Sequence, residues 1–169
     1  LINRNGEFTV NVALIETNIP TKGAVSIPEK HKLYIGGTSL GYSKLIEGDK
    51  VSVLNMCKNT NFENVIKSEP LRVVASRSHQ NSTLGLFLEK FDTVHLNEMG
   101  SSVKFMSIAD QKADIYPRFS PCMEWDTAAS DAILRSLGHQ IRSISPTFEV
   151  GNKLVYNKEN LYNSAFVAY

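Results

Sequence analysis

Apolar and polar residues alternate in the first part of the chain. In the stretch 7–15, one face carries Phe8, Val10, Val12 and Leu14, and this period of two predicts a β-strand. Two shorter apolar runs, 24–27 and 32–35, flank the polar segment Pro28–His31 and predict a hairpin. The chain is therefore expected to begin with antiparallel strands.

The segments around these strands are less decisive. Residues 18–23 predict a turn, and Gly36, Gly37 and Gly41 indicate a glycine-rich turn before a polar stretch that ends near Asn55. The pattern from 55 to 70 fits either a loop or a short helix. We expect residues 1–70 to form an antiparallel sheet region, the first of two regions in the chain.

From Leu71 onward the apolar spacing predicts strands that alternate with helices. Strands are predicted at 71–75, 93–96 and 113–119. Helical spacing is found at Leu84, Phe87, Leu88 and Phe91, then over 101–111, and then from Asp126 to a C-cap at Gly138. These three strand–helix units predict an α/β region over 71–169. The fold class expected for the whole chain is a layered α/β fold: antiparallel strands followed by a βαβαβα sheet.

The composition excludes several classes of protein. A net charge of +1 over 169 residues gives no basic surface for nucleic acid. No apolar run approaches the roughly 20 residues of a transmembrane helix, and no signal peptide precedes the first strand. Cys57 and Cys122 lack metal-site spacing and are expected to be reduced thiols. We expect a cytoplasmic location, with peripheral attachment to the cytoplasmic face of a bacterial inner membrane as an alternative; the oligomeric state is left open.

One acidic residue lies where a strand, a turn and a helix follow one another. The turn Ser120–Pro121 ends the strand 113–119, and Asp126 and Thr127 then open the last helix. The simplest interpretation makes Asp126 the N-cap, a role worth about 1 kcal/mol. The alternative makes it a ligand of a hard cation such as Mg²⁺, which one carboxylate does not hold without others. Spacing leaves both interpretations open.

Further polar groups follow the neighbouring strands. Ligands of such sheets bind beyond the carboxyl ends of the strands, so these groups are expected to meet Asp126 at one edge. Each of them also fits a helix cap or a solvated surface charge when taken singly, but together they suit an anion. Their convergence beside a carboxylate predicts hydrolysis of a phosphate monoester. The candidates are Arg77, His79, Ser101, Ser102, Lys104 and Arg118.

Several motifs resemble those of a known enzyme family. Asp-Ile-Tyr-Pro-Arg-Phe at 114–119, followed by Glu-Trp-Asp-Thr-Ala-Ala at 124–129, resembles the C-terminal signature of the inositol-monophosphatase-like superfamily. The Tyr-Pro-Arg-Phe segment narrows this resemblance to the 3′(2′),5′-bisphosphate nucleotidases of the CysQ type. Similar segments occur at 3–11, 74–79, 100–105 and 156–163, so the resemblance covers nearly the whole chain.

The resemblance implies a fold, a reaction and a site. It implies the C-terminal portion of an inositol-monophosphatase/sugar-phosphatase-like fold. It implies Mg²⁺-dependent removal of the 3′-phosphate of adenosine 3′,5′-bisphosphate, giving AMP, in sulfate assimilation. By the same resemblance the metal ligand is Asp126, and contacts to the nucleotide are expected from His79, Ser101, Lys104 and Arg118, with Arg77 and Ser102 as further candidates.

The other metal ligands of that family have no counterpart in this sequence. A glutamate and the two aspartates of an Asp-Pro-Leu-Asp-Gly-Thr motif precede the position that matches Leu1, and Glu7 and Glu16 lie in a different context. Because Mg²⁺ affinity depends on ligand number and charge, we expect the chain by itself to be inactive or nearly so. Two alternatives stay open: hydrolysis of inositol or sugar phosphates, and metal-independent binding of a nucleotide or phosphate without turnover.

Overall fold

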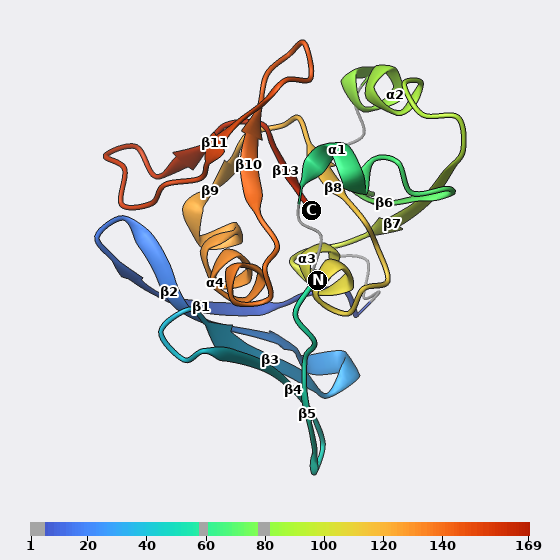
Figure 1. Cartoon of the computed structure of the whole chain (residues 1–169). Helices are drawn as coiled ribbons and strands as arrows, with labels where there is room; N and C mark the ends of the chain where they lie inside the picture. Colours follow the sequence, from blue (N-terminus) through green and yellow to red (C-terminus); the bar gives the residue numbers. More distant parts are fainter. Residues whose placement is uncertain (1–5, 58–60, 78–81) are drawn as a thin grey trace.

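The structure is a computed structural model that describes residues 6–57, 61–77 and 82–169. A five-stranded sheet forms one layer, two central helices form the next, and the remaining strands lie on the far side of those helices (Figure 1). The first sheet runs in chain order with every neighbouring pair antiparallel. Its strands are β1 (Val10–Glu16), β2 (Ile19–Ile27), β3 (Lys32–Gly37), β4 (Tyr42–Glu47) and β5 (Lys50–Val53).

Of the two turns predicted in this sheet, one is wrong and the other is confirmed. The chain reverses at Thr17 and Asn18, which have φ angles of 49° and 64°, so β2 begins at Ile19 and no turn covers 18–23. Asparagine enters this left-handed region readily because its side chain bonds locally. The glycine-rich turn is confirmed, since the chain reverses between Gly37 and Gly41, and the polar stretch that follows forms β4 and β5. The hairpin around Pro28 is confirmed, with the short 3₁₀ turn η1 (Pro28–Lys30) between β2 and β3.

The second part of the chain mixes parallel and antiparallel pairing. β6 (Leu71–Ser76) pairs in parallel with β7 (Val94–Met99), and a parallel bridge joins Val73 to Ile115. The other strands are β8 (Tyr116–Arg118), β9 (Cys122–Met123), β10 (Ile141–Ile144), β11 (Val150–Lys153), β12 (Tyr162–Asn163) and β13 (Phe166–Ala168). The third predicted strand is therefore shorter than expected: it is β8, which pairs antiparallel with β13 in a sheet of order β11-β10-β13-β8.

The helices are shorter than predicted but lie where the spacing placed them. α2 (Ser82–Leu88) buries Leu84 and Phe87, as its apolar face predicted. The undecided segment 55–70 contains the one-turn helix α1 (Phe62–Val65). The two central helices are α3 (Val103–Ala109) and α4 (Ala128–Ser136), the latter preceded by the 3₁₀ turn η2 (Glu124–Asp126). In the parts of the chain that are described, no helix combines the length and the apolar composition needed to cross a membrane.

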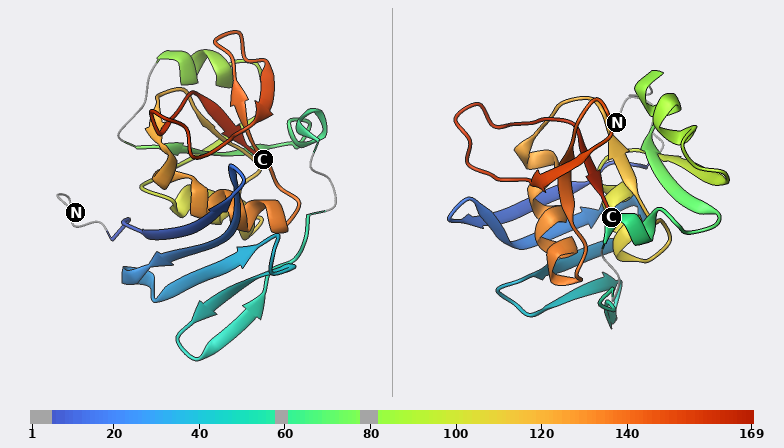
Figure 2. Two further views of the ribbon diagram at one scale, coloured as in Figure 1. Left: turned by 90° about the vertical axis from the view of Figure 1, so that its left-hand side faces the viewer. Right: turned by 45° about the horizontal axis from the view of Figure 1, so that its top comes forward.

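The two central helices fill the space between the sheets (Figure 2). A β-carbon added at Gly23 of β2 would lie 2.1 Å from the carbonyl oxygen of Ala129, so glycine allows this close approach of sheet and helix. One hydrophobic cluster joins residues of the first sheet, both helices and the C-terminal strands. A division into domains at residue 70 stays a prediction. The first turns of α3 and α4 open at the same edge of this core.

The apolar face of β1 points away from the core. Val10, Val12 and Leu14 are 54%, 64% and 46% exposed, whereas Ala13 and Ile15 of the opposite face pack against the core. The five-stranded sheet is an outer layer of the described structure (Figure 1). Its outer surface is therefore an apolar surface in contact with solvent.

Candidate functional site

A pocket of about 220 Å³ lies where the ends of β6 and β7 meet the starts of α3 and α4. It brings together five of the residues predicted from the sequence. Arg77 is not among its lining residues, although its neighbour Ser76 is, and His79 lies outside the described residues. The predicted residues in the wall are Ser101, Ser102, Lys104, Arg118 and Asp126.

Asp126 is not the N-cap of α4, so that interpretation of the sequence is wrong. The residue is the last one of η2, and the N-cap position belongs to Thr127, whose hydroxyl donates to the carbonyl oxygen of Glu124 at 3.1 Å. Asp126 itself is exposed and lines the pocket. Asp126 therefore borders the pocket and does not occupy the cap position of the helix.

The turn that carries Asp126 is held by the C-terminal segment of the chain. The side chain of Glu124, 4% exposed, accepts hydrogen bonds from the backbone N–H groups of Asn157 and Lys158 at 2.8 Å and 3.1 Å. The Lys158 ammonium donates to Glu124 Oε1 at 2.5 Å and to Asn163 Oδ1 at 3.1 Å. Asn163 in turn donates to Thr127 Oγ1 at 2.8 Å. Sequence reasoning missed Glu124 and Lys158 because their charges lie 34 positions apart.

The pocket contains a buried cation. Lys104 is 2% exposed, and its ammonium donates to the carbonyl oxygens of Met99 at 3.2 Å and Ser101 at 2.7 Å. Burial, followed by the nearby Arg118 charge, lowers the pKa of Lys104 to about 8, against the raising effects of Glu7 and Asp126. At neutral pH the amine is still mostly protonated. A buried lysine of this kind is well suited to an anionic partner that completes its charge balance.

Arg118 supplies a second cation at the end of β8. Its Nε and Nη2 donate to the carbonyl oxygens of Ser120 and Pro121 at 3.1 Å and 3.3 Å, which fixes the guanidinium beside the turn that follows. Aromatic rings line the same pocket: Tyr116 contacts Phe105 and Phe166 edge-on, with ring centroids 4.9 Å and 5.6 Å apart. Burial raises the pKa of Tyr116 to about 12. The pocket is therefore lined by two cationic side chains together with packed aromatic rings.

The two serines belong to a turn that contacts β1. Ser102 donates to the backbone oxygen of Asp126 at 3.3 Å and accepts from Asn11 at 3.0 Å, and Ser101 Oγ lies 2.5 Å from Thr9 Oγ1. Ser102 is the N-cap of α3 but makes no side-chain cap bond. Sequence reasoning missed Thr9 and Asn11, although their alternation with Val10 and Val12 marked them as the other face of the strand.

The described donors do not make a complete magnesium site. Among the residues that the structure describes, no group of three or more His, Cys, Asp or Glu side chains could hold a metal ion. Asp126 is one hard oxygen donor at the edge of an anion pocket, and Mg²⁺ binding needs more ligands than this. The donor set of the described chain therefore does not fit Mg²⁺ by itself.

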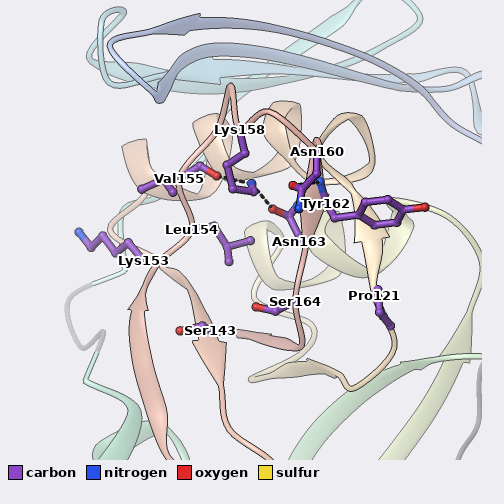
Figure 3. A pocket seen from close by; sticks show the side chains of 10 residues that line it. All are labelled: Pro121, Ser143, Lys153, Leu154, Val155, Lys158, Asn160, Tyr162, Asn163 and Ser164. Atoms are coloured by element: carbon purple, nitrogen blue, oxygen red, sulfur yellow. Dashed lines mark hydrogen bonds between the residues drawn. The ribbon is translucent and has the colours of Figure 1, made fainter.

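A larger cavity of about 540 Å³ shares no lining residue with this pocket. Figure 3 shows that its wall comes mainly from the C-terminal strands and their connections, with Lys158 bonded to Asn163 and to the Val155 carbonyl oxygen. Lys158 lines this cavity, but its ammonium is already paired with the carboxylate of Glu124, in the turn that carries Asp126. The predicted chemistry gathers in the smaller pocket.

Comparison with known proteins decides the family. The model of the inositol monophosphatase family matches residues 2–166. The chain belongs to this family. The resemblance inferred from the motifs at 114–119 and 124–129 is thereby confirmed, and so is the layered α/β fold class.

Individual members of the family are similar over nearly the whole chain. The 3′(2′),5′-bisphosphate nucleotidase CysQ of Buchnera aphidicola is 35% identical over 99% of this chain and 58% of its own length. CysQ of Escherichia coli K12 is 34% identical over 83% of this chain and 52% of its own length. The crystal structure of CysQ from Bacteroides thetaiotaomicron, 33% identical, superposes with a TM-score of 0.79 over 99% of this chain and 64% of that one. The chain thus spans little more than half the length of the two curated relatives.

Proposed function

We propose that the pocket binds the phosphate groups of a nucleotide and belongs to a Mg²⁺-dependent 3′(2′),5′-bisphosphate nucleotidase. The proposal is supported by the relatives at 33% to 35% identity, which carry that name or the name CysQ. The substrate proposed is adenosine 3′,5′-bisphosphate, a by-product of sulfate assimilation, and its sulfated relative is a second substrate. This chain contributes the nucleotide side of the site and one carboxylate of the metal side.

The observation that carries the proposal is the meeting of two cations, two hydroxyls and one carboxylate in a single pocket. Lys104 and Arg118 supply positive charge, and arginine in particular suits bidentate contact with phosphate. Ser101 and Ser102 supply hydroxyls from the adjoining turn. Lys104 is not a surface lysine, because it is buried, and Ser102 makes no side-chain cap bond to its helix.

The position of Asp126 indicates why a divalent cation is expected. A carboxylate beside a phosphate site repels the substrate unless a cation lies between them. Bound Mg²⁺ would supply that positive charge and polarise the phosphate. Since the described residues offer one such carboxylate, the remaining donors are proposed to come from outside them. The whole protein is then active, and this chain by itself is nearly inactive.

The reaction breaks the bond between phosphorus and the 3′-oxygen of the ribose, with water as the incoming group and AMP and phosphate as products. The residues of this chain would act on the nucleotide that remains: Lys104 and Arg118 hold its other phosphate, and the serine hydroxyls orient it. Binding of this kind raises the rate by holding the ester in one orientation. The non-catalytic alternative predicts the same binding without turnover.

Phosphate release from adenosine 3′,5′-bisphosphate tests the proposal. The 169-residue chain and a fusion that adds the upstream portion of the Escherichia coli relative are assayed side by side with Mg²⁺ and with EDTA. The proposal predicts Mg²⁺-dependent release by the fusion and almost none by the chain. A panel with inositol phosphate and a sugar bisphosphate separates the substrate alternatives. Equal release by both proteins contradicts the proposed division of metal ligands, and no release by the fusion contradicts the function.

A further inference from the structure

The turn that carries the pocket hydroxyls is held from the opposite sheet. Three residues spaced two apart, two just before β1 and one within it, contact the turn 100–102. Their polar face is the one opposite the exposed valines of the same strand. The contacts are Glu7 Oε2 to the Gly100 N–H at 2.8 Å, Thr9 Oγ1 to Ser101 Oγ at 2.5 Å, and Asn11 Nδ2 to Ser102 Oγ at 3.0 Å.

Glu7 is itself held by an arginine. Arg77 places Nη1 3.0 Å from Glu7 Oε2 and Nη2 3.1 Å from Glu7 Oε1, and Nη2 also donates to the carbonyl oxygen of Glu98 at 3.0 Å. The carboxylate thus connects the entry to β1 with the ends of β6 and β7. Because Arg77 balances its charge, an acid is tolerated beside a site for anions.

The turn needs such support. Ser101 has a φ angle of 49°, a left-handed conformation that is unfavourable for a residue other than glycine. A β-carbon added at Gly100 would lie 2.9 Å from the Glu7 β-carbon, so the two backbones meet as closely as glycine permits. On the other side, Lys104 donates to the carbonyl oxygen of Ser101 at 2.7 Å. Bonds from both sides therefore fix a turn that would otherwise relax.

We propose that Glu7 is a positioning residue, whose carboxylate holds the Gly100 amide and so presents Ser101, Ser102 and Lys104 to the phosphate. This inference rests on the proposed function, in which the pocket binds phosphate. Arg77 then acts on Glu7 and not on the nucleotide. Glu7 touches no substrate in this scheme, and it acts entirely through the turn.

Calorimetric titration of the 169-residue chain with AMP in EDTA tests the role, because charge and positioning predict opposite signs. Removing an acid near an anion site strengthens AMP binding if charge alone matters. The positioning role predicts that Glu7→Ala weakens binding about tenfold, and that Glu7→Gln, which keeps an acceptor for the Gly100 amide, stays within about threefold. Thr9→Val, which loses the Ser101 contact and keeps the side-chain shape, weakens binding about threefold.

Two further variants separate the possible failures. Glu16→Ala is the matched control, since this acid lies at the other end of β1 and accepts from Thr21, and its AMP affinity is expected to equal that of the unaltered chain. Lys104→Ala is expected to lose AMP binding. One outcome overturns the role of Glu7 alone: Lys104→Ala loses AMP binding, but Glu7→Ala and Thr9→Val bind AMP at least as tightly as the unaltered chain. The proposed function then stands. If the unaltered chain binds no AMP, or Lys104→Ala binds it equally well, both are overturned.

Discussion

The Lys158 ammonium lies 2.5 Å from Glu124 Oε1, and this pair fastens the C-terminal segment to the turn that presents Asp126. Glu124 is nearly fully buried, and the side chain of Lys158 is about one-third exposed. Two backbone N–H groups, those of Asn157 and Lys158, complete the set of donors to the carboxylate. The position of the candidate metal ligand therefore depends on residues more than thirty positions further along the chain.

Loss of the Lys158 charge should destabilise the fold. Lys158→Met leaves the buried Glu124 carboxylate with backbone donors only, and we expect the free energy of unfolding to fall by about 2 kcal/mol. Lys153→Met is the matched control because Lys153 is an exposed lysine of the same region, and its effect is expected within about 0.5 kcal/mol. Urea unfolding of the three proteins measures both values. Equal destabilisation by the two substitutions would show that the pair with Glu124 contributes nothing.

The same carboxylate should make stability depend on acid pH. Burial tends to raise the pKa of Glu124, but the Lys158 ammonium and the two backbone N–H groups together hold it below the ordinary value of 4.5. The folded state thus favours the ionised form, so its stabilising effect is complete above pH 4.5 and is lost as the pH falls through the lowered pKa. Melting temperatures of the unaltered chain and Glu124→Gln should converge toward low pH. A constant difference between pH 7 and the acid limit of folding contradicts this assignment.

Binding of AMP should weaken in mildly alkaline solution. The pKa of Lys104 is lowered to about 8, mainly by burial, so the ammonium loses its proton well before an ordinary lysine. The phosphate of AMP is fully ionised above about pH 7, and burial raises the pKa of Cys122 above 9.0. Affinity in EDTA is therefore expected to be level near pH 7 and to fall by up to about tenfold per pH unit above 8.

Lys104→Arg is the control for that titration, because arginine stays charged throughout this range. Its affinity for AMP should show no decline between pH 7 and 9.5, whatever its absolute value. The effect of pH on folding stability has the opposite sign. Between pH 8 and 10.5 the unfolded chain holds the Lys104 proton and the folded chain does not, so the contribution of Lys104 to stability rises with pH. Parallel declines in the two proteins would exclude Lys104 as the titrating group.

The outer face of the first sheet should bind apolar dyes. Val12 and Val53 are 64% and 66% exposed on strands at opposite edges of the sheet. Valine-to-threonine changes at both positions keep the β-branched shape and remove apolar surface, so the fluorescence of bound anilinonaphthalene sulfonate should fall. The same change at Val155, exposed elsewhere, is the control and should leave it unchanged. No difference between the variants would mean that the sheet face is not the dye site.

Local sequence patterns predicted the periodic helices and strands. They did not predict features that depend on contacts between segments distant in the sequence. The period of two correctly marked β1, but it did not show that Val10 and Val12 face outward, because this depends on which layer covers which side. The four strands after Gly138 are short and interrupted, with between two and four residues each, too few for a periodic signal. Asp126 was found as a candidate, and its mistaken role as a cap arose because Thr127 beside it fits the same position.

The site was predicted as far as its chemistry is local in sequence. Ser101, Ser102, Lys104 and Arg118 were identified because cations and hydroxyls follow predicted strands, and they do line one pocket. Arg77 also follows a strand, but the same pattern gave no hint of its ion pair with Glu7. Supporting residues such as Glu7, Glu124 and Lys158 act through contacts across 33 to 93 positions, which no local pattern encodes.

Titration of the chain with adenosine 3′,5′-bisphosphate in EDTA tests the central claim most directly, namely that Lys104 and Arg118 form a phosphate site beside Asp126. We expect saturable one-to-one binding that Lys104→Ala combined with Arg118→Ala abolishes. Asp126→Asn, which removes a repelling charge, should bind the nucleotide at least as tightly. Its free energy of unfolding should lie within about 0.5 kcal/mol of that of the unaltered chain. No binding by the unaltered chain, or undiminished binding by the double variant, would contradict the account.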